Sequence, residues 1–323
     1  DHRDLHSFPT RRSSDLVFSA FKKYDGVFVR YLKSIEYQQM SGRAGRRGMD
    51  SVGYVYGDIS DETKTGKELT RIVSGSVEPV KSQFNLSYST LLSLYHKIGD
   101  DVIKACEKSF GAYQRKKQSQ KKDKFAFEQK QIIKKKLAFL KTLGYLDGNK
   151  LTSKGRFAIC INGYEIQLTE LFFNGILENQ NEITLFMILV SLVFESKKND
   201  SKGKMPKELK AFTKKIEGCI KAIKSVEYMY ALKEEVKMPD FGMAVTSFVW
   251  ASGKTFADAM KFTNASPGDV IRNFRQAIQL CRQLRKVCQG YDAFISIVDK
   301  CMEAVNRDEV NALKQLETFA SIK

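Results

Sequence analysis

Apolar positions follow two different patterns along the chain, and the change comes near residue 67. Before it, residues 17–20 and 53–56 are short apolar or aromatic runs that predict strands, the first of them buried. Residues 32–40, between them, predict a short helix. A strand, a helix and a second strand indicate the end of an α/β lobe. From Lys67 onward, apolar residues recur at helical spacing and predict a helical remainder.

Two polar stretches interrupt the helical region, and each is too polar to be buried. They are the basic segment 114–124 and the segment 195–207, and we expect both to be solvated loops or helix extensions. The apolar run 183–194 is too short to span a bilayer and predicts a buried core helix. We find no signal peptide pattern.

A helix followed by a hairpin is predicted between the two polar stretches. Residues 131–143 predict a helix whose apolar face carries Ile133, Leu137 and Leu140. The sequence Asp-Gly-Asn at 147–149 can then turn a hairpin. A helix and a hairpin with basic residues indicate a winged helix, and a plain helical hairpin is the alternative.

The net charge adds information about partners. Lys and Arg number 54 and Asp and Glu 37, which gives a formal net charge of +17. An excess that large favours a polyanionic partner, nucleic acid before a membrane, over a merely soluble basic surface.

The cysteines and histidines predict no metal site. The six cysteines form no CxxC pair and the sequence has three histidines, so no zinc site can be assembled. We expect the cysteines to be small buried hydrophobic residues in a reducing compartment, the cytoplasm or, in a eukaryote, the nucleus.

The first sixteen residues differ from the rest. Residues 1–16 have no helical or strand period and resemble the translation of a sequencing adapter joined to a truncated reading frame. We expect a non-native tail here, with an ordinary disordered terminus as the alternative.

One motif carries candidate chemistry: QMSGRAGRRG at residues 39–48. If the motif starts a helix, Arg43 and Arg46 lie on one face and can aim at the same anion. The alternative is a Gly-rich basic loop that binds nucleic acid without catalysis. The full string, following a strand in an α/β lobe, matches the last helicase motif of superfamily two, QxxGRxGR.

Further strings make nearly the whole chain from residue 17 resemble the Ski-two-like DExH helicases. They occur in that family's order and include FKKYDG at 21–26, SVEPVKSQFNLSY at 76–88, GYL at 144–146, LTSKGR at 151–156, EIQLTEL at 165–171 and WASGKTF at 250–256. The resemblance implies a mixed, mainly α fold in three native parts. These are the end of a second RecA-like lobe (17–66), a winged-helix region (67–160, with the basic insertion 114–124) and a helical DSHCT domain (161–323).

The resemblance also implies a function and its site. Family members are 3′-to-5′ ATP-dependent RNA helicases that work with RNA-degrading exonuclease machinery, and the intact enzyme would use ATP and Mg²⁺. Arg43 and Arg46 would be catalytic in the ATP cleft, beside the nucleotide-binding Gln39 and Gly42.

Departures from the family pattern limit what this chain could do alone. No GxxxxGK[ST] or DExH string occurs, so we expect the first RecA-like lobe to be absent. Larger relatives insert a long arch in the winged-helix region, where this chain has only the basic stretch 114–124, so we expect no arch. We therefore expect this chain alone to be inactive and to bind no nucleotide. The segment SGKT at 252–255 lacks the first glycine of a phosphate loop and is predicted to connect two helices.

A capped helix is predicted after Ser266, with Pro267 at its first position. Its apolar face is expected to carry Ile271, Phe274, Ile278, Cys281, Leu284 and Cys288. By resemblance this is the ratchet helix lining the RNA channel, and its polar side would contact RNA. The polar side comprises Arg272, Arg275, Gln276, Gln279, Arg282 and Lys286. Some relatives carry Arg and Glu where Gln276 and Gln279 stand.

Two alternatives remain open from sequence. One is a non-catalytic winged-helix protein that binds nucleic acid, in which the arginine motif is only a basic loop. The other is a DNA-unwinding relative of the RNA helicases.

Overall fold

The computed structural model describes residues 15–25, 28–45, 48, 50–59, 66–80, 82, 86–118, 122–197, 207–233 and 236–311. The chain divides into two compact units, residues 1–82 and 83–323. The predicted mixed, mainly helical fold is confirmed. The first unit ends later than the boundary predicted at residue 66, because helix α2 packs against α1. Residues 83–323 form one compact unit, in which the predicted winged-helix and helical domains are not separated.

The first unit contains a two-stranded parallel sheet and a hairpin. Strand β1 (Asp15–Phe18) pairs in parallel with β4 (Tyr54–Gly57), with Val17 opposite Tyr56. An antiparallel hairpin, helix α1 and helix α2 complete the unit; they are β2 (Lys22–Tyr24), β3 (Val29–Tyr31), α1 (Ser34–Ser41) and α2 (Gly66–Ser74). The small core consists of Phe18, Phe21, Leu32 and Ile72.

The strand and helix order of this unit is as predicted, with local differences. The first strand begins at Asp15, inside the segment predicted to be a tail, and residues 1–14 lie outside the described residues. Only Phe18 of this strand is buried, whereas Val17 is 70% exposed, because side chains of a strand alternate between two faces. The β2–β3 hairpin was not predicted, since its three-residue strands are too short to show an alternating pattern.

The second unit begins with the helix-and-hairpin arrangement. The elements are α3 (Tyr88–Ile98), α4 (Asp101–Glu107), α5 (Phe110–Gln118), α6 (Lys122–Thr142), β5 (Leu146–Asp147), β6 (Lys150–Leu151) and α7 (Ser153–Ile159). The predicted hairpin is confirmed, with Asp147 opposite Lys150. Ile133, Leu137 and Leu140 of α6 are buried as predicted. In the described part of 114–124, α5 and α6 continue as helix, so the segment extends both helices rather than forming one loop.

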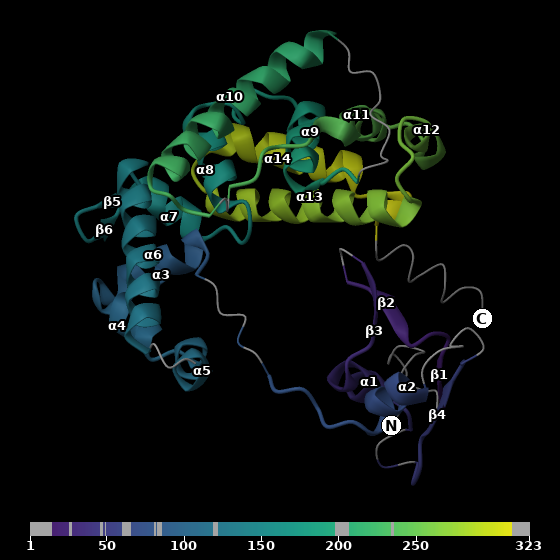
Figure 1. Cartoon of the computed structure of the whole chain (residues 1–323). Coiled ribbons are helices and arrows are strands. Elements are labelled where there is room, and N and C mark those ends of the chain that lie inside the picture. The colour runs from purple at the N-terminus through teal and green to yellow at the C-terminus, as the bar shows by residue number, and fades with distance from the viewer. Residues whose placement is uncertain are drawn as a thin grey trace. The chain divides into compact units, whose positions relative to one another are not determined.

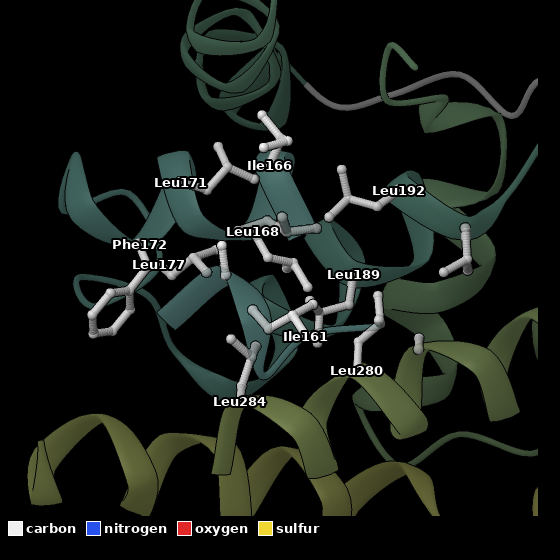
Figure 2. Packing of buried hydrophobic residues seen from close by; sticks show 14 of the residues in the cluster. Ile161, Ile166, Leu168, Leu171, Phe172, Leu177, Leu189, Leu192, Leu280 and Leu284 are labelled. Carbon is white, nitrogen blue, oxygen red and sulfur yellow. The ribbon is translucent and has the colours of Figure 1, made fainter. Parts of the chain in front are cut away.

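Seven helices and two 3-10 turns complete the described part of the second unit. They are α8 (Glu165–Phe173), α9 (Glu182–Val193), α10 (Lys207–Met229), α11 (Ala244–Ala251), α12 (Phe256–Met260), α13 (Pro267–Val287) and α14 (Asp292–Val305), with 3-10 turns η2 (Phe241–Met243) and η3 (Asp308–Val310). Helix α9 packs against α11, α13 and α14 (Figure 1). Its residues from Leu185 to Val193 are all buried, which confirms the predicted core helix. In Figure 2, Leu280 and Leu284 of α13 point toward Ile161 and Leu189. Among the described helices, none is both long and apolar enough to cross a membrane.

Candidate nucleic-acid and nucleotide interface

The arginine motif lies at the end of a helix, not at its start. Helix α1 ends at Ser41, and the backbone N–H of Gly42 donates to the Gln38 carbonyl at 2.9 Å. The next residues form turns, and Gly45 has a φ of +78°, a conformation that favours glycine. Arg43 is therefore exposed on a turn, and the expectation that the motif starts a helix is wrong, because α1 ends before it. Arg46 itself lies outside the described residues.

Close backbone packing holds this turn in place. A Cβ atom added at Gly53 would lie 2.5 Å from the carbonyl carbon of Ala44 and 2.7 Å from the Gly45 nitrogen. Gly53 is thus required for the chain before β4 to approach the motif. Sequence reasoning placed Gly53 in a strand and missed this role; its only signal was a glycine directly before the aromatic strand.

Two carboxylates fix the beginning of α1. The Glu36 carboxylate accepts hydrogen bonds from both terminal nitrogens of Arg30, at 2.8 and 2.9 Å, and forms an ion pair with Lys23 at 2.7 Å. The Arg30 hydrogen bonds are the main reason why the pKa of Glu36 lies well below its usual range. Glu78 accepts the N–H groups of Ser34 and Ile35 at 3.1 and 3.0 Å. The helix that leads to the motif is therefore anchored at its N-terminus by charge-assisted hydrogen bonds.

Helix α13 begins as predicted, but its buried face differs slightly from the predicted one. The Ser266 hydroxyl accepts the Asp269 N–H at 3.2 Å, and Pro267 is the first helical residue. Val270 is fully buried, whereas Ile271 is only half-buried, so its assignment to the buried face was wrong. The core-facing stripe is centred on Val270, Phe274, Cys281 and Leu284, and a residue next to Val270 points about 100° away from it.

The polar residues of α13 fall into two groups. Arg272, Gln276, Gln279, Arg282 and Lys286 are exposed. Arg272 pairs with Asp269 at 3.2 Å, and Arg282 donates to the Gln279 side chain at 3.3 Å. Arg275 is different, because its guanidinium donates to the carbonyls of Val310 and Glu309 at 2.8 and 3.2 Å. Arg275 therefore ties α13 to η3.

A shallow groove runs along the same helix. It lies between α13 and α14, has a volume of about 580 Å³ and is lined by Ile278, Arg282, Arg285, Met302, Glu303 and Asn306. Arg285 pairs with Asp299 of α14 at 2.8 Å, whereas Arg282 pairs with no carboxylate among the described residues. The exposed side of α13 thus combines cations with amides, a donor set that suits phosphate oxygens.

The segment 252–255 connects α11 to α12, as predicted. Gly253 has a φ of +82°, and the Thr255 hydroxyl accepts the Asp258 N–H at 3.1 Å. Contacts with Lys261 and Thr255 lower the pKa of Asp258 to about 2. The hydroxyl that a phosphate loop would use for Mg²⁺ caps a helix here.

The cysteines are mostly buried, with one clear exception. Cys160 is exposed, so the prediction of burial is wrong for it, and Cys219 is half-buried. The Sγ atoms of Cys281 and Cys301 lie 3.7 Å apart in the core as free thiols. Across the described ranges, no group of three or more His, Cys, Asp or Glu side chains could hold a metal ion.

Comparison with known proteins gives one family and a consistent set of relatives. The model of the DSHCT (NUC185) domain matches residues 148–312. The DExH-box ATP-dependent RNA helicase DExH11 of Arabidopsis thaliana is 33% identical over 39% of this chain and 9% of its own length. The exosome RNA helicase MTR4 of Mus musculus is 40% identical over 31% of this chain and 9% of its own length.

A third relative agrees with these two. The superkiller complex protein 2 of Homo sapiens is 28% identical over 45% of this chain and 12% of its own length. The matched segments thus span about a tenth of the length of these relatives. The DSHCT match covers more than half of the chain and includes all of α13, so the chain belongs to the DSHCT domain family.

Proposed function

We propose that this chain is the C-terminal part of an ATP-dependent 3′-to-5′ RNA helicase of the exosome-associated type. The observation that carries the proposal is helix α13, which lies within the DSHCT match and buries one side while it presents cations and amides on the other. The names of the relatives and the motif at residues 39–48 support the same function.

Helix α13 would contact single-stranded RNA through phosphates. Arg272, Arg282 and Lys286 supply charge on the exposed side, and Gln276 and Gln279 supply amides that can reach sugars or bases. Contacts of this kind bind without strong sequence preference, as a translocating enzyme requires. Arg275 would act indirectly, because it holds η3 against the helix.

The motif turn would supply the arginines of the ATP cleft. Arg43 is exposed and makes no ion pair with any described residue, so its guanidinium is available to a phosphate. Gln39 and Gly42 lie on the same short segment, and Arg46 follows three residues after Arg43. These donors fit ATP phosphates but include no carboxylate for Mg²⁺, which another part of the intact enzyme would have to hold. Bound ATP with Mg²⁺ would supply the phosphoryl group whose hydrolysis drives movement along RNA.

The partners and the location follow from the same proposal. The intact protein would place this chain beside a first RecA-like lobe and would deliver RNA to exonuclease machinery. That work belongs to the cytoplasm or, in a eukaryote, to the nucleus.

A salt titration of RNA binding tests the proposal. The chain should bind a labelled single-stranded oligouridylate, and log K should fall by about 0.7 per unit of log salt for each phosphate neutralised. R272Q/R282Q should make the slope shallower by about 1.4 while the far-ultraviolet circular dichroism stays unchanged, since both side chains are exposed. An unchanged slope would remove α13 from the RNA path. Equal or tighter binding of the matching DNA would favour a DNA-unwinding relative.

ATP hydrolysis tests the other half of the proposal. The chain alone should show no hydrolysis, because phosphoryl transfer needs the lysine, the carboxylates and the arginines positioned together. Robust hydrolysis by residues 17–323, abolished by R46A, would contradict the assignment to a C-terminal part.

A further inference from the structure

Helix α6 carries an exposed row of one aromatic and three lysine side chains. Phe127 is 61% exposed, and Lys130, Lys134 and Lys141 are exposed as well. Their spacing of three, four and seven residues places them along one side of the helix over about 20 Å. We call these four residues the α6 row.

The opposite side of α6 is committed to the core. Ile133, Phe139 and Leu140 are buried there, and Leu137, seven residues after Lys130 at the edge of the row, is buried as well. Lys136, which is 3% exposed on this inner side, donates to the Leu86 carbonyl and lies 5.3 Å from the centre of the Tyr88 ring. The one described lysine on the inner side therefore has specific partners, and the α6 row is not needed for packing.

The three lysines of the α6 row have no described carboxylate within ion-pair distance. Lys141 lies 5.8 Å from the centre of the Tyr95 ring, and the Tyr95 hydroxyl donates to Asn149 at the tip of the β5–β6 hairpin. The end of the row is thereby held beside the hairpin, where Lys150 adds another exposed cation. Lysines without a described carboxylate partner, held along one side of a helix, are complementary to a polyanion.

Helix α10 offers an internal comparison. Lys210, Lys214 and Lys221 are exposed at the same spacing of four and seven residues. Glu217, however, falls on that same side between them, and no described aromatic residue precedes the set at the position equivalent to Phe127. The two lysine triples thus carry equal positive charge, but Lys207 stands in α10 where α6 has Phe127, and α10 has an acidic neighbour.

We propose that the α6 row is a second binding surface for single-stranded RNA, in which Phe127 stacks on a base while Lys130, Lys134 and Lys141 contact successive phosphates. An exposed aromatic ring within a row of cations is the combination that single-strand-binding proteins use. The proposal rests on the proposed function for the identity of the polymer as RNA. The row and α13 belong to the same compact unit, so one strand can be held at two places on it.

The test uses fluorescence anisotropy of the full chain with a labelled oligouridylate over a range of salt concentrations. K130Q/K134Q/K141Q should make the salt slope shallower by about 2, since each lysine neutralises up to one phosphate. The matched control K210Q/K214Q/K221Q removes the same charge at the same spacing and should leave the slope unchanged. F127A should weaken binding about tenfold at every salt concentration without changing the slope, because stacking does not release counterions.

The outcomes separate this proposal from the proposed function. Equal effects of the two lysine triples would mean that only the overall charge matters, and this would overturn the α6 row. If K130Q/K134Q/K141Q and F127A bound RNA as tightly as the parent while R272Q/R282Q bound it more weakly, the proposed role of the α6 row would be wrong and the role of α13 would stand. If only the α6 variants bound RNA more weakly, the α6 row would be supported as an RNA-binding surface and α13 would not be one. If the α6 triple bound RNA normally but lost binding to vesicles containing 30% phosphatidylserine, the row would be a membrane surface instead.

Discussion

Replacing Trp250 should destabilise the second unit more than any exposed substitution nearby. Trp250 is the only tryptophan in the sequence and is fully buried in α11. Its indole N–H donates to the Val305 carbonyl at 3.0 Å, and the Arg307 guanidinium lies 3.6 Å from the ring centre. The ring also stacks with Phe274 of α13 at 6.3 Å. One side chain therefore joins α11, α13 and the end of α14.

The size of the effect follows from these contacts. Truncation of a buried tryptophan to alanine costs about 4 kcal/mol. The Val305 carbonyl also loses its donor, which adds about 1 kcal/mol. W250A should thus lower the free energy of unfolding by about 5 kcal/mol. W250F keeps the aromatic packing but not the donor and should cost about 1–2 kcal/mol.

Urea unfolding followed by far-ultraviolet circular dichroism measures these values. With a slope of about 2–3 kcal/mol per M for a unit of this size, W250A should lower the midpoint by about 2 M. The control is F248A in the same helix, where the side chain is 42% exposed and the cost should stay below about 1 kcal/mol. A W250A midpoint within about 0.3 M of the parent, or equal losses in W250A and F248A, would refute the reasoning.

Three further predictions concern the motif, the pH response and the thiols. In a full-length enzyme, R46A should lower kcat by at least about 10²-fold with little change in KM, because its contact strengthens as charge develops on the phosphoryl group; unchanged turnover would return Arg46 to a basic loop. The lowered pKa of Glu36 means that its contribution to stability is present above the unfolded pKa of about 4.3 and is lost as pH falls below it. Hydrogen exchange of residues 34–41 in the full chain, corrected for intrinsic rates, should show this acid loss in the parent and not in E36Q. Cys160 should react rapidly with a disulfide reagent, and C160S should remove that phase. Burial raises the pKa of Cys288 to about 12, so this thiol should stay unreactive until urea unfolds the chain; fast labelling of Cys288 in the native chain would contradict the packing of α13.

Local signals in the sequence determined much of this protein. The run of apolar residues at 183–194 could only be a buried helix, and Ser266 followed by Pro267 specified the beginning of α13. Asp-Gly-Asn at 147–149 specified the hairpin, and the glycines and arginines at 39–48 identified the motif. In each case residues a few positions apart carry the whole signal, because turns, caps and helical periodicity depend on local backbone geometry.

Contacts between residues far apart in the sequence determine the anchoring of α1, the buried face of α13 and the role of Arg275. Glu78 anchors α1 although it lies more than forty residues from Ser34, and Arg275 bonds to carbonyls more than thirty residues later. The small difference in orientation that buries Val270 instead of Ile271 depends on how α9 and α14 pack against α13. Spacing alone gave Arg272 and Arg275 the same role, and only the position of η3 separates them. No local pattern specifies such partners, since their energies come from surfaces that meet only when the chain is folded.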